Sequence, residues 1–205
     1  MNCLSTLLLR TIEGLVKKLK HHKGNTWFCK SGLFVSAMLQ ESYDAGHNDF
    51  PIDLSSIDKK IMYVGSMIDG KPNDPIRIKI KGSDISNQLC GFGSWECSFS
   101  IKGDTGHGLG NLSEYCSFDV EGNAWVRCGQ ESKHSKYMIA GSVGKKCAYK
   151  AEDSEFTIKG DIDGTDDLTG FFGNYAIDCT FVLDKKSIDK KIRLYQACQK
   201  YSCKM

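Results

Sequence analysis

The chain has 205 residues, with 27 basic and 25 acidic side chains and a formal net charge of +2 at pH 7. This length suits one domain or a solenoid with appended ends, and so balanced a charge does not by itself predict a nucleic-acid groove. The 21 glycines and 3 prolines favour turn-rich β structure over disorder. No apolar run is long enough to span a membrane and no secretory signal is evident, so we expect a cytoplasmic protein without a transmembrane segment.

Residues 1–60 are expected to form a helical cap. Apolar positions between residues 2 and 23 follow helical spacing, and lysine and histidine residues crowd the last turn before Gly24. A second helix is expected near residues 32–43, followed by a loop at residues 45–51. A cap is the favoured role of the first helix because open solenoid ends expose strand edges. A docking helix for a partner and an anchor on a membrane surface are the alternatives.

A five-residue phrase recurs through residues 61–184. Most copies read aromatic-x-aliphatic-x-Gly, and the last four glycines follow one another at intervals of 19 residues: Gly103, Gly122, Gly141 and Gly160. The alternation predicts a short strand with one buried face, ended by a glycine at positive φ. A fixed period of this length predicts a mainly β protein, a right-handed parallel β-helix with coils of about 19 residues.

Two further columns of the repeat carry small or apolar residues that we expect to face the interior. They lie six and thirteen residues after the phrase glycine. The cysteines placed in these columns are Cys90, Cys97, Cys116, Cys128, Cys147 and Cys179. We expect reduced, packed thiols, with disulfides between neighbouring coils as the alternative.

The glycine spacing within the coils resembles a known β-helix family. Gly103, Gly106 and Gly110 have the G-x-x-G-x-x-x-G spacing of the GXGXG β-helix domain. This domain closes the large subunit of glutamate synthase and forms much of one subunit of formylmethanofuran dehydrogenase. Other coils keep part of the pattern, at Gly82, at Gly122 and Gly129, at Gly141 and Gly144, and at Gly160. The resemblance covers about half of the chain and implies a scaffold that holds catalytic domains or subunits together, with no catalytic residues carried over.

One coil is longer than the others, with six extra residues between residues 161 and 173. Such insertions bulge from one face of a solenoid and often bind ligands. Its aspartates are weak candidates for a calcium site, because Ca²⁺ prefers several carboxylate oxygens: Asp161, Asp163, Asp166 and Asp167. The downstream glutamate of a calcium loop is missing, so a solvated acidic turn is favoured, and no cofactor is expected.

The favoured function is a non-catalytic scaffold or protein-interaction module, accessory to a larger enzyme complex or forming homo-oligomers. The alternative is an enzyme or a ligand-binding or metal-binding protein that uses the outer face near residues 161–173. Cys128 is expected to point inward, away from His107 and His134, which disfavours a nucleophile–base pair. Residues 185–205 return to helical spacing and are expected to close the far end.

Nucleic-acid binding is a further, disfavoured alternative. A basic strip could run over two coils with interleaved tyrosines, from Lys133, Lys136, Lys145, Lys146 and Lys150 with Tyr137 and Tyr149. Scattered lysines on a solenoid more often serve solubility and edge protection, so no clear nucleic-acid partner is expected.

Overall fold

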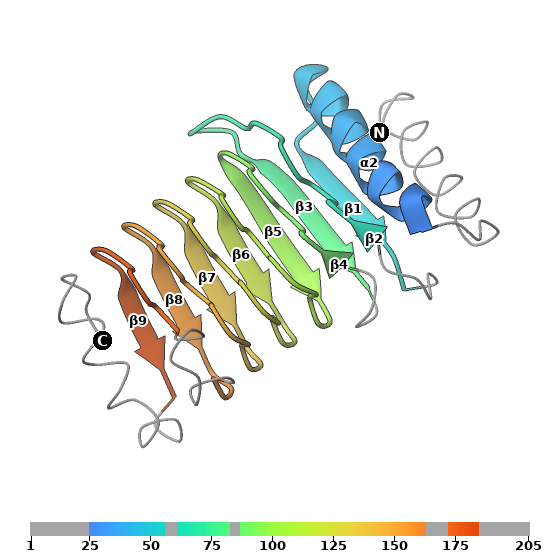
Figure 1. Cartoon of the computed structure of the whole chain (residues 1–205). Coiled ribbons are helices and arrows are strands. Elements are labelled where there is room, and N and C mark those ends of the chain that lie inside the picture. The colour runs from blue at the N-terminus through green and yellow to red at the C-terminus, as the bar shows by residue number, and fades with distance from the viewer. Residues whose placement is uncertain (1–24, 56–60, 83–86, 163–171, 185–205) are drawn as a thin grey trace.

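Alternating buried and exposed residues produce short parallel strands that stack coil upon coil. In a computed structural model the described residues form a seven-stranded parallel sheet in the order β1-β3-β5-β6-β7-β8-β9 (Figure 1). Its strands are β1 (Asp49–Asp53), β3 (Ile76–Lys81), β5 (Cys97–Lys102), β6 (Ser117–Val120), β7 (Lys136–Ile139), β8 (Glu155–Ile158) and β9 (Thr180–Leu183). Two shorter strands, β2 (Ile61–Met62) and β4 (Asn87–Gln88), pair in a second parallel sheet. The prediction of a mainly β, parallel solenoid is confirmed.

The structure describes residues 25–55, 61–82, 87–162 and 172–184. The helices predicted at residues 2–23 and 185–205 lie outside these ranges. Within the ranges, no helix is both long and apolar enough to cross a membrane.

Each coil has two further sides, along which neighbouring coils meet through isolated parallel bridges. The buried column consists of Thr105, Ala124, Val143 and Ile162. The column on the outside consists of Asp69, Trp95, Glu114, Lys133, Glu152 and Ile177. In the regular coils, each residue therefore lies beside the one 19 positions later.

Aromatic rings fill the interior as a continuous stack. The stack consists of Phe99, Phe118, Tyr137, Phe156 and Phe181, which are all buried. From Phe99 to Phe156 successive ring centroids lie 4.8, 4.9 and 4.6 Å apart, and their planes differ by no more than 8°. Such ring pairs stabilise a core by roughly 0.5–1.5 kcal/mol each beyond the area that they bury.

The glycine that ends each phrase is needed for a reason that the sequence did not reveal. Only Gly103 takes positive φ (116°), so the expectation is wrong for the three glycines that follow it in this column. A Cβ atom on Gly122, Gly141 or Gly160 would lie 2.6 Å from the carbonyl oxygen of the phrase glycine one coil earlier. The coils approach too closely there for any side chain.

Positive φ occurs instead in a second column, seven residues after the phrase glycine in the regular coils. Gly110 and Gly129 take φ values of 58° and 62°, and Ala148 follows at 56°. A Cβ atom on Gly129 would lie 2.6 Å from the ring of Phe156. These glycines turn the chain and leave room for the ring stack.

The remaining glycines of the predicted pattern lie between coils or inside them. Gly82 donates its N–H to the carbonyl of Lys102 (3.2 Å). A Cβ atom on Gly144 would lie 3.0 Å from the backbone nitrogen of Val126. Gly106 is buried.

Helix α2 (Asn25–Asp44) covers the first coil, which confirms the helix predicted at residues 32–43 and extends it (Figure 1). The helix ends at a glycine in left-handed conformation, Gly46, with φ of 94°. The N–H of Gly46 donates to the carbonyl of Tyr43 (2.8 Å), and the N–H of His47 donates to that of Ser42 (3.1 Å). This pattern satisfies carbonyls that the last turn leaves without helical partners.

Two polar side chains of α2 form hydrogen bonds with backbone groups of the first coil. In the middle of the solenoid, the neighbouring coil forms such bonds. The Ser36 hydroxyl lies 2.7 Å from the carbonyl oxygen of Tyr63 and accepts the N–H of Ser66 (3.0 Å). The Gln40 amide accepts the N–H of Asp69 (2.8 Å) and donates to its carbonyl (3.2 Å). The helix therefore ends the solenoid by imitating a strand edge.

The sheet begins before residue 61, because β1 occupies part of the expected loop at residues 45–51. Phe50 pairs with Ile78, and Ile52 pairs with Ile80. Pro51 hid this strand, since proline lacks the N–H of a ladder and is tolerated only at a sheet edge, which β1 is. The segment at residues 61–65 resembles the phrase by sequence but forms β2 and the turn after it.

Candidate interaction surfaces

The cysteine thiols of the interior are shielded from solvent. The six cysteines at residues 90, 97, 116, 128, 147 and 179 are free and buried, as expected for packed thiols. Burial raises the pKa of the Cys90 and Cys147 thiols. A hydrogen bond with Cys116, and then burial, raise the pKa of the Cys97 thiol. Because the thiolate is the reactive form, Cys90, Cys97 and Cys147 are poor nucleophiles and poor metal ligands.

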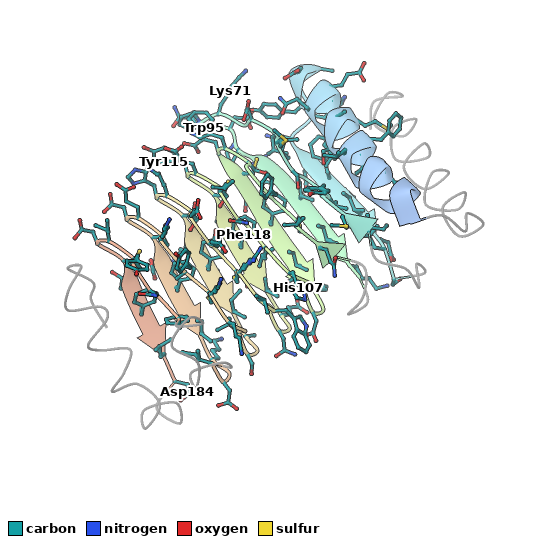
Figure 2. All side chains as sticks on the ribbon, in the orientation of Figure 1. Lys71, Trp95, His107, Tyr115, Phe118 and Asp184 are labelled. Atoms are coloured by element: carbon teal, nitrogen blue, oxygen red, sulfur yellow. The ribbon has the colours of Figure 1, made fainter. Side chains whose placement is uncertain are left out.

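The structure keeps the candidate nucleophile apart from the candidate bases. Cys128 is fully buried, whereas His107 and His134 are exposed on the outside of the solenoid. Figure 2 shows His107 at the end of the coils opposite Tyr115. A cysteine–histidine pair is therefore absent from this part of the chain.

The acidic insertion is only partly described. Asp161 is exposed, and its backbone N–H donates to the hydroxyl of Ser142 (2.9 Å). Asp163, Asp166 and Asp167 lie outside the described residues. Among the described residues, no group of three or more histidine, cysteine or acidic side chains could hold a metal ion. The calcium site stays a prediction.

An outer edge of the solenoid carries a ladder of paired side chains. The rings of Tyr115 and His134 stack at 4.7 Å, and Trp95 meets Tyr115 edge to face at 6.1 Å. His134 Nδ1 lies 3.6 Å from a carboxylate oxygen of Asp153. Figure 2 shows Trp95 and Tyr115 along the same edge. Tyr115 and His134 each cover one face of the other ring, so these two rings are engaged with each other.

The predicted strip of five lysines is not one surface. Lys133 pairs with Glu152 (2.9 Å), and Lys136 pairs with Glu155 (3.2 Å). The ion pair with Lys133 lowers the pKa of the Glu152 carboxyl. Tyr137 is buried in the ring stack and cannot interleave with surface charges. Only the lysines at residues 145, 146 and 150 remain from the predicted strip.

A groove runs along α2 where the helix meets the first coil. It has a volume of about 450 Å³ and is lined by Leu33, Ser36, Ala37, Gln40, Glu41, Asp44, Ser66 and Met67. Leu33 is 41% exposed and Met67 is 70% exposed, and the neighbouring Phe34 is 50% exposed. Sequence reasoning missed this groove, although the apolar residues on both sides of the helix were a signal for it.

Comparison of the chain with protein-family models, with curated proteins and with solved structures found no match. The resemblance to the GXGXG β-helix domain therefore stays a prediction.

Proposed function

We propose that this protein is a non-catalytic scaffold that binds a protein partner through the groove along α2. One observation carries the proposal: α2 exposes Leu33, and the first coil exposes Met67, on either side of a groove that also holds the polar groups of the cap. Val35, Leu39 and Tyr43 point into the core. A cap needs only that inner face, together with its polar contacts to the coil.

The apolar side chains of the groove have a specific arrangement. Leu33 and Ala37 lie one helical turn apart, and Met67 approaches them from the first coil. Exposed methionine is common on surfaces that bind partner segments, because its side chain adapts to irregular shapes. The groove therefore suits two or three apolar anchor residues of a partner segment.

Acidic groups at one end of the groove indicate the charge of that segment. Glu41 and Asp44 are exposed and line the groove. Asp44 accepts a hydrogen bond from Gln40 (3.1 Å). Opposite charges at an interface rim favour association and fix the register. The partner segment should carry lysine or arginine beside its apolar anchors.

The solenoid suits the role of a rigid support. Its interior is closed by the ring stack and by buried cysteines, and its sheet face carries cross-coil ion pairs such as Lys102–Glu121 (3.8 Å). An accessory subunit of a cytoplasmic enzyme complex, as the family resemblance implies, is the assembly that we favour. A second copy of the chain is the other possible occupant of the groove.

Site-specific photo-crosslinking in the native host tests the proposal. A photoreactive residue at Ala37, in the groove, should capture a defined protein, and Met67→Glu in the same chain should abolish that capture. A photoreactive residue at Thr157, on the sheet face, is the matched control. Equal capture from both positions, or capture that survives Met67→Glu, would contradict a partner site in the groove.

A further inference from the structure

Four basic side chains gather at one corner of two neighbouring coils. Lys145 and Lys146 belong to the second of these coils, and Arg127 holds the position of Lys146 in the first. The N–H of Arg127 donates to the carbonyl of Lys145 (2.8 Å), which places these segments side by side. Lys150 follows in the same turn region. We call this surface, with Trp125 and Tyr149, the basic corner.

The positive charges of the basic corner lack ion-pair partners within the part of the chain that the structure describes. Among the residues that the structure describes, none of the four cations forms an ion pair, unlike Lys133 and Lys136 on the other sides. Glu131 occupies the position of Lys150 one coil earlier, where its carboxylate accepts a hydrogen bond from Gln130 (3.1 Å).

A tyrosine ring holds two of the lysines together. The Nζ atoms of Lys146 and Lys150 lie 5.8 and 5.5 Å from the centroid of the Tyr149 ring. Attraction to the ring offsets part of the repulsion between the two ammonium groups. Two positive charges therefore lie close together over one aromatic ring.

Trp125 offers an aromatic face beside these charges. Its side chain is 50% exposed, and no ring of the described residues stacks on it. The bridges from Thr105 to Ala124 and from Ala124 to Val143 align Trp125 with Gly106 and Gly144 in the coils on either side. Because glycine has no side chain, neither of these neighbours places a side chain against the half-exposed indole.

We infer that the basic corner binds single-stranded nucleic acid, with a base stacked on Trp125 and phosphates contacting the four cations. An unpaired base can stack on an aromatic ring while the backbone follows a positive surface, whereas a duplex keeps its bases inside. The basic corner is smaller than the predicted strip of five lysines, because Lys133 and Lys136 lie on other sides of the solenoid. This inference is independent of the groove along α2.

Fluorescence anisotropy with labelled oligo(dT) and oligo(U) of about 12 nucleotides, at about 50 mM salt, tests the inference. Four phosphate contacts on a single strand predict a slope of about −3 for the logarithm of the binding constant against the logarithm of the salt concentration. Quenching of tryptophan emission on binding, lost in Trp125→Ala, would report the stacked base.

Substitutions separate the proposed contacts from general charge. Trp125→Ala should weaken binding roughly tenfold or more, because it removes a stacked base. Lys145→Glu and Lys150→Glu should each weaken binding at least roughly fivefold and flatten the salt slope. Lys159→Glu makes the same charge change at an exposed lysine of the sheet face and should leave binding nearly unchanged. Circular dichroism shows which variants remain folded.

The inference is overturned if neither oligonucleotide binds at low salt, or if Lys159→Glu weakens binding as much as the corner variants. It is also overturned if duplex DNA or inorganic polyphosphate competes as well as the single strand and Trp125→Ala has no effect. Those results would describe attraction between opposite charges without recognition of a base. Binding of both oligonucleotides that depends on Trp125, Lys145 and Lys150 supports it.

Discussion

The ring stack is regular through the middle of the solenoid and opens at its last step. From Phe99 to Phe156 the centroids of successive rings lie 4.6–4.9 Å apart with nearly parallel planes. From Phe156 to Phe181 the distance is 5.6 Å, and the planes differ by 24°. The rings at this step are both phenylalanine, so the difference arises in what surrounds them.

Two neighbours differ at the irregular step. A glycine lies beside each regular step, whereas Ala148 holds the equivalent position between Phe156 and Phe181 and takes the same positive φ, 56°. Phe172 follows the long insertion, occupies the column of Cys147, and contacts Phe181 at 4.9 Å with a tilt of 59°. Both differences add bulk beside the last step, and the methyl group of Ala148 is the one that a single substitution can remove.

The largest expected effect comes from placing a methyl group in the regular region. Gly129→Ala should lower the free energy of unfolding by roughly 3 kcal/mol, because it adds a left-handed backbone cost and overlaps the Phe156 ring. Urea unfolding followed by circular dichroism measures the change.

Gly46→Ala is the matched control for that variant. Gly46 has a φ of 94°, and a Cβ atom added there would meet nothing within 4 Å. The Gly46→Ala variant should lose only about 1 kcal/mol in the free energy of unfolding, the cost of an alanine in left-handed backbone. Equal losses in the two variants would show that crowding of the rings is unimportant.

The reverse substitution should regularise the last step. Ala148→Gly removes the methyl group and relieves the left-handed strain, so it should raise the free energy of unfolding by about 1 kcal/mol, net of the entropy gained by the unfolded chain. A high-resolution structure of the variant should show Phe181 closer to parallel with Phe156. If the tilt persists, Phe172 causes it.

Tyr137→Phe tests the polar contact within the regular stack. The Tyr137 hydroxyl donates to the carbonyl of Gly110 (2.9 Å) and lies 2.9 Å from the Ser113 hydroxyl. Ser113 keeps its own hydrogen bond to Gly110 (2.8 Å) in the variant. The free energy of unfolding should therefore fall by only about 0.5–1 kcal/mol. A loss above about 2 kcal/mol would mean that the hydroxyl organises the stack.

The smallest effect concerns an outer ion pair of the regular region. Lys133 lowers the pKa of the Glu152 carboxyl, so the attraction is present above the carboxyl's unfolded pKa and is lost as pH falls through the folded one. In Lys133→Gln, a titration by nuclear magnetic resonance should show the pKa of Glu152 moving up toward its ordinary value. Lys136→Gln is the control and should leave Glu152 unchanged, because its partner is Glu155.

The sequence was sufficient to predict the solenoid, because alternating apolar residues and phrase glycines recur at 19 residues. The same spacing could have revealed the pairs of Lys133 with Glu152 and of Tyr115 with His134, which lie 19 residues apart. It could also have aligned Trp125 with its flanking glycines. The insertion changes the offset to the following coil, as in the bridge from Glu152 to Ile177, so the 19-residue spacing does not apply beyond Ile162.

Other features depend on packing that spacing does not encode. The strand at Phe50 was hidden by Pro51, and the phrase glycines allow a close approach of neighbouring coils that arises only in the folded chain. The groove along α2 depends on how Gly32 seats the helix, since a Cβ atom there would lie 1.7 Å from the carbonyl oxygen of Met62. The apolar residues on both sides of the helix were a signal for this groove, but its shape depends on that close seating of the helix.

Native-state fractionation of host lysates tests the scaffold claim most directly. The wild-type protein should migrate in a complex larger than its own monomer. Met67→Glu, in the groove, should release it to the monomer position. Val182→Glu makes the same change at a half-exposed apolar residue of β9 and should leave the complex intact. If the wild-type protein migrates as a monomer, or if both variants keep the complex, the groove along α2 does not bind a protein partner.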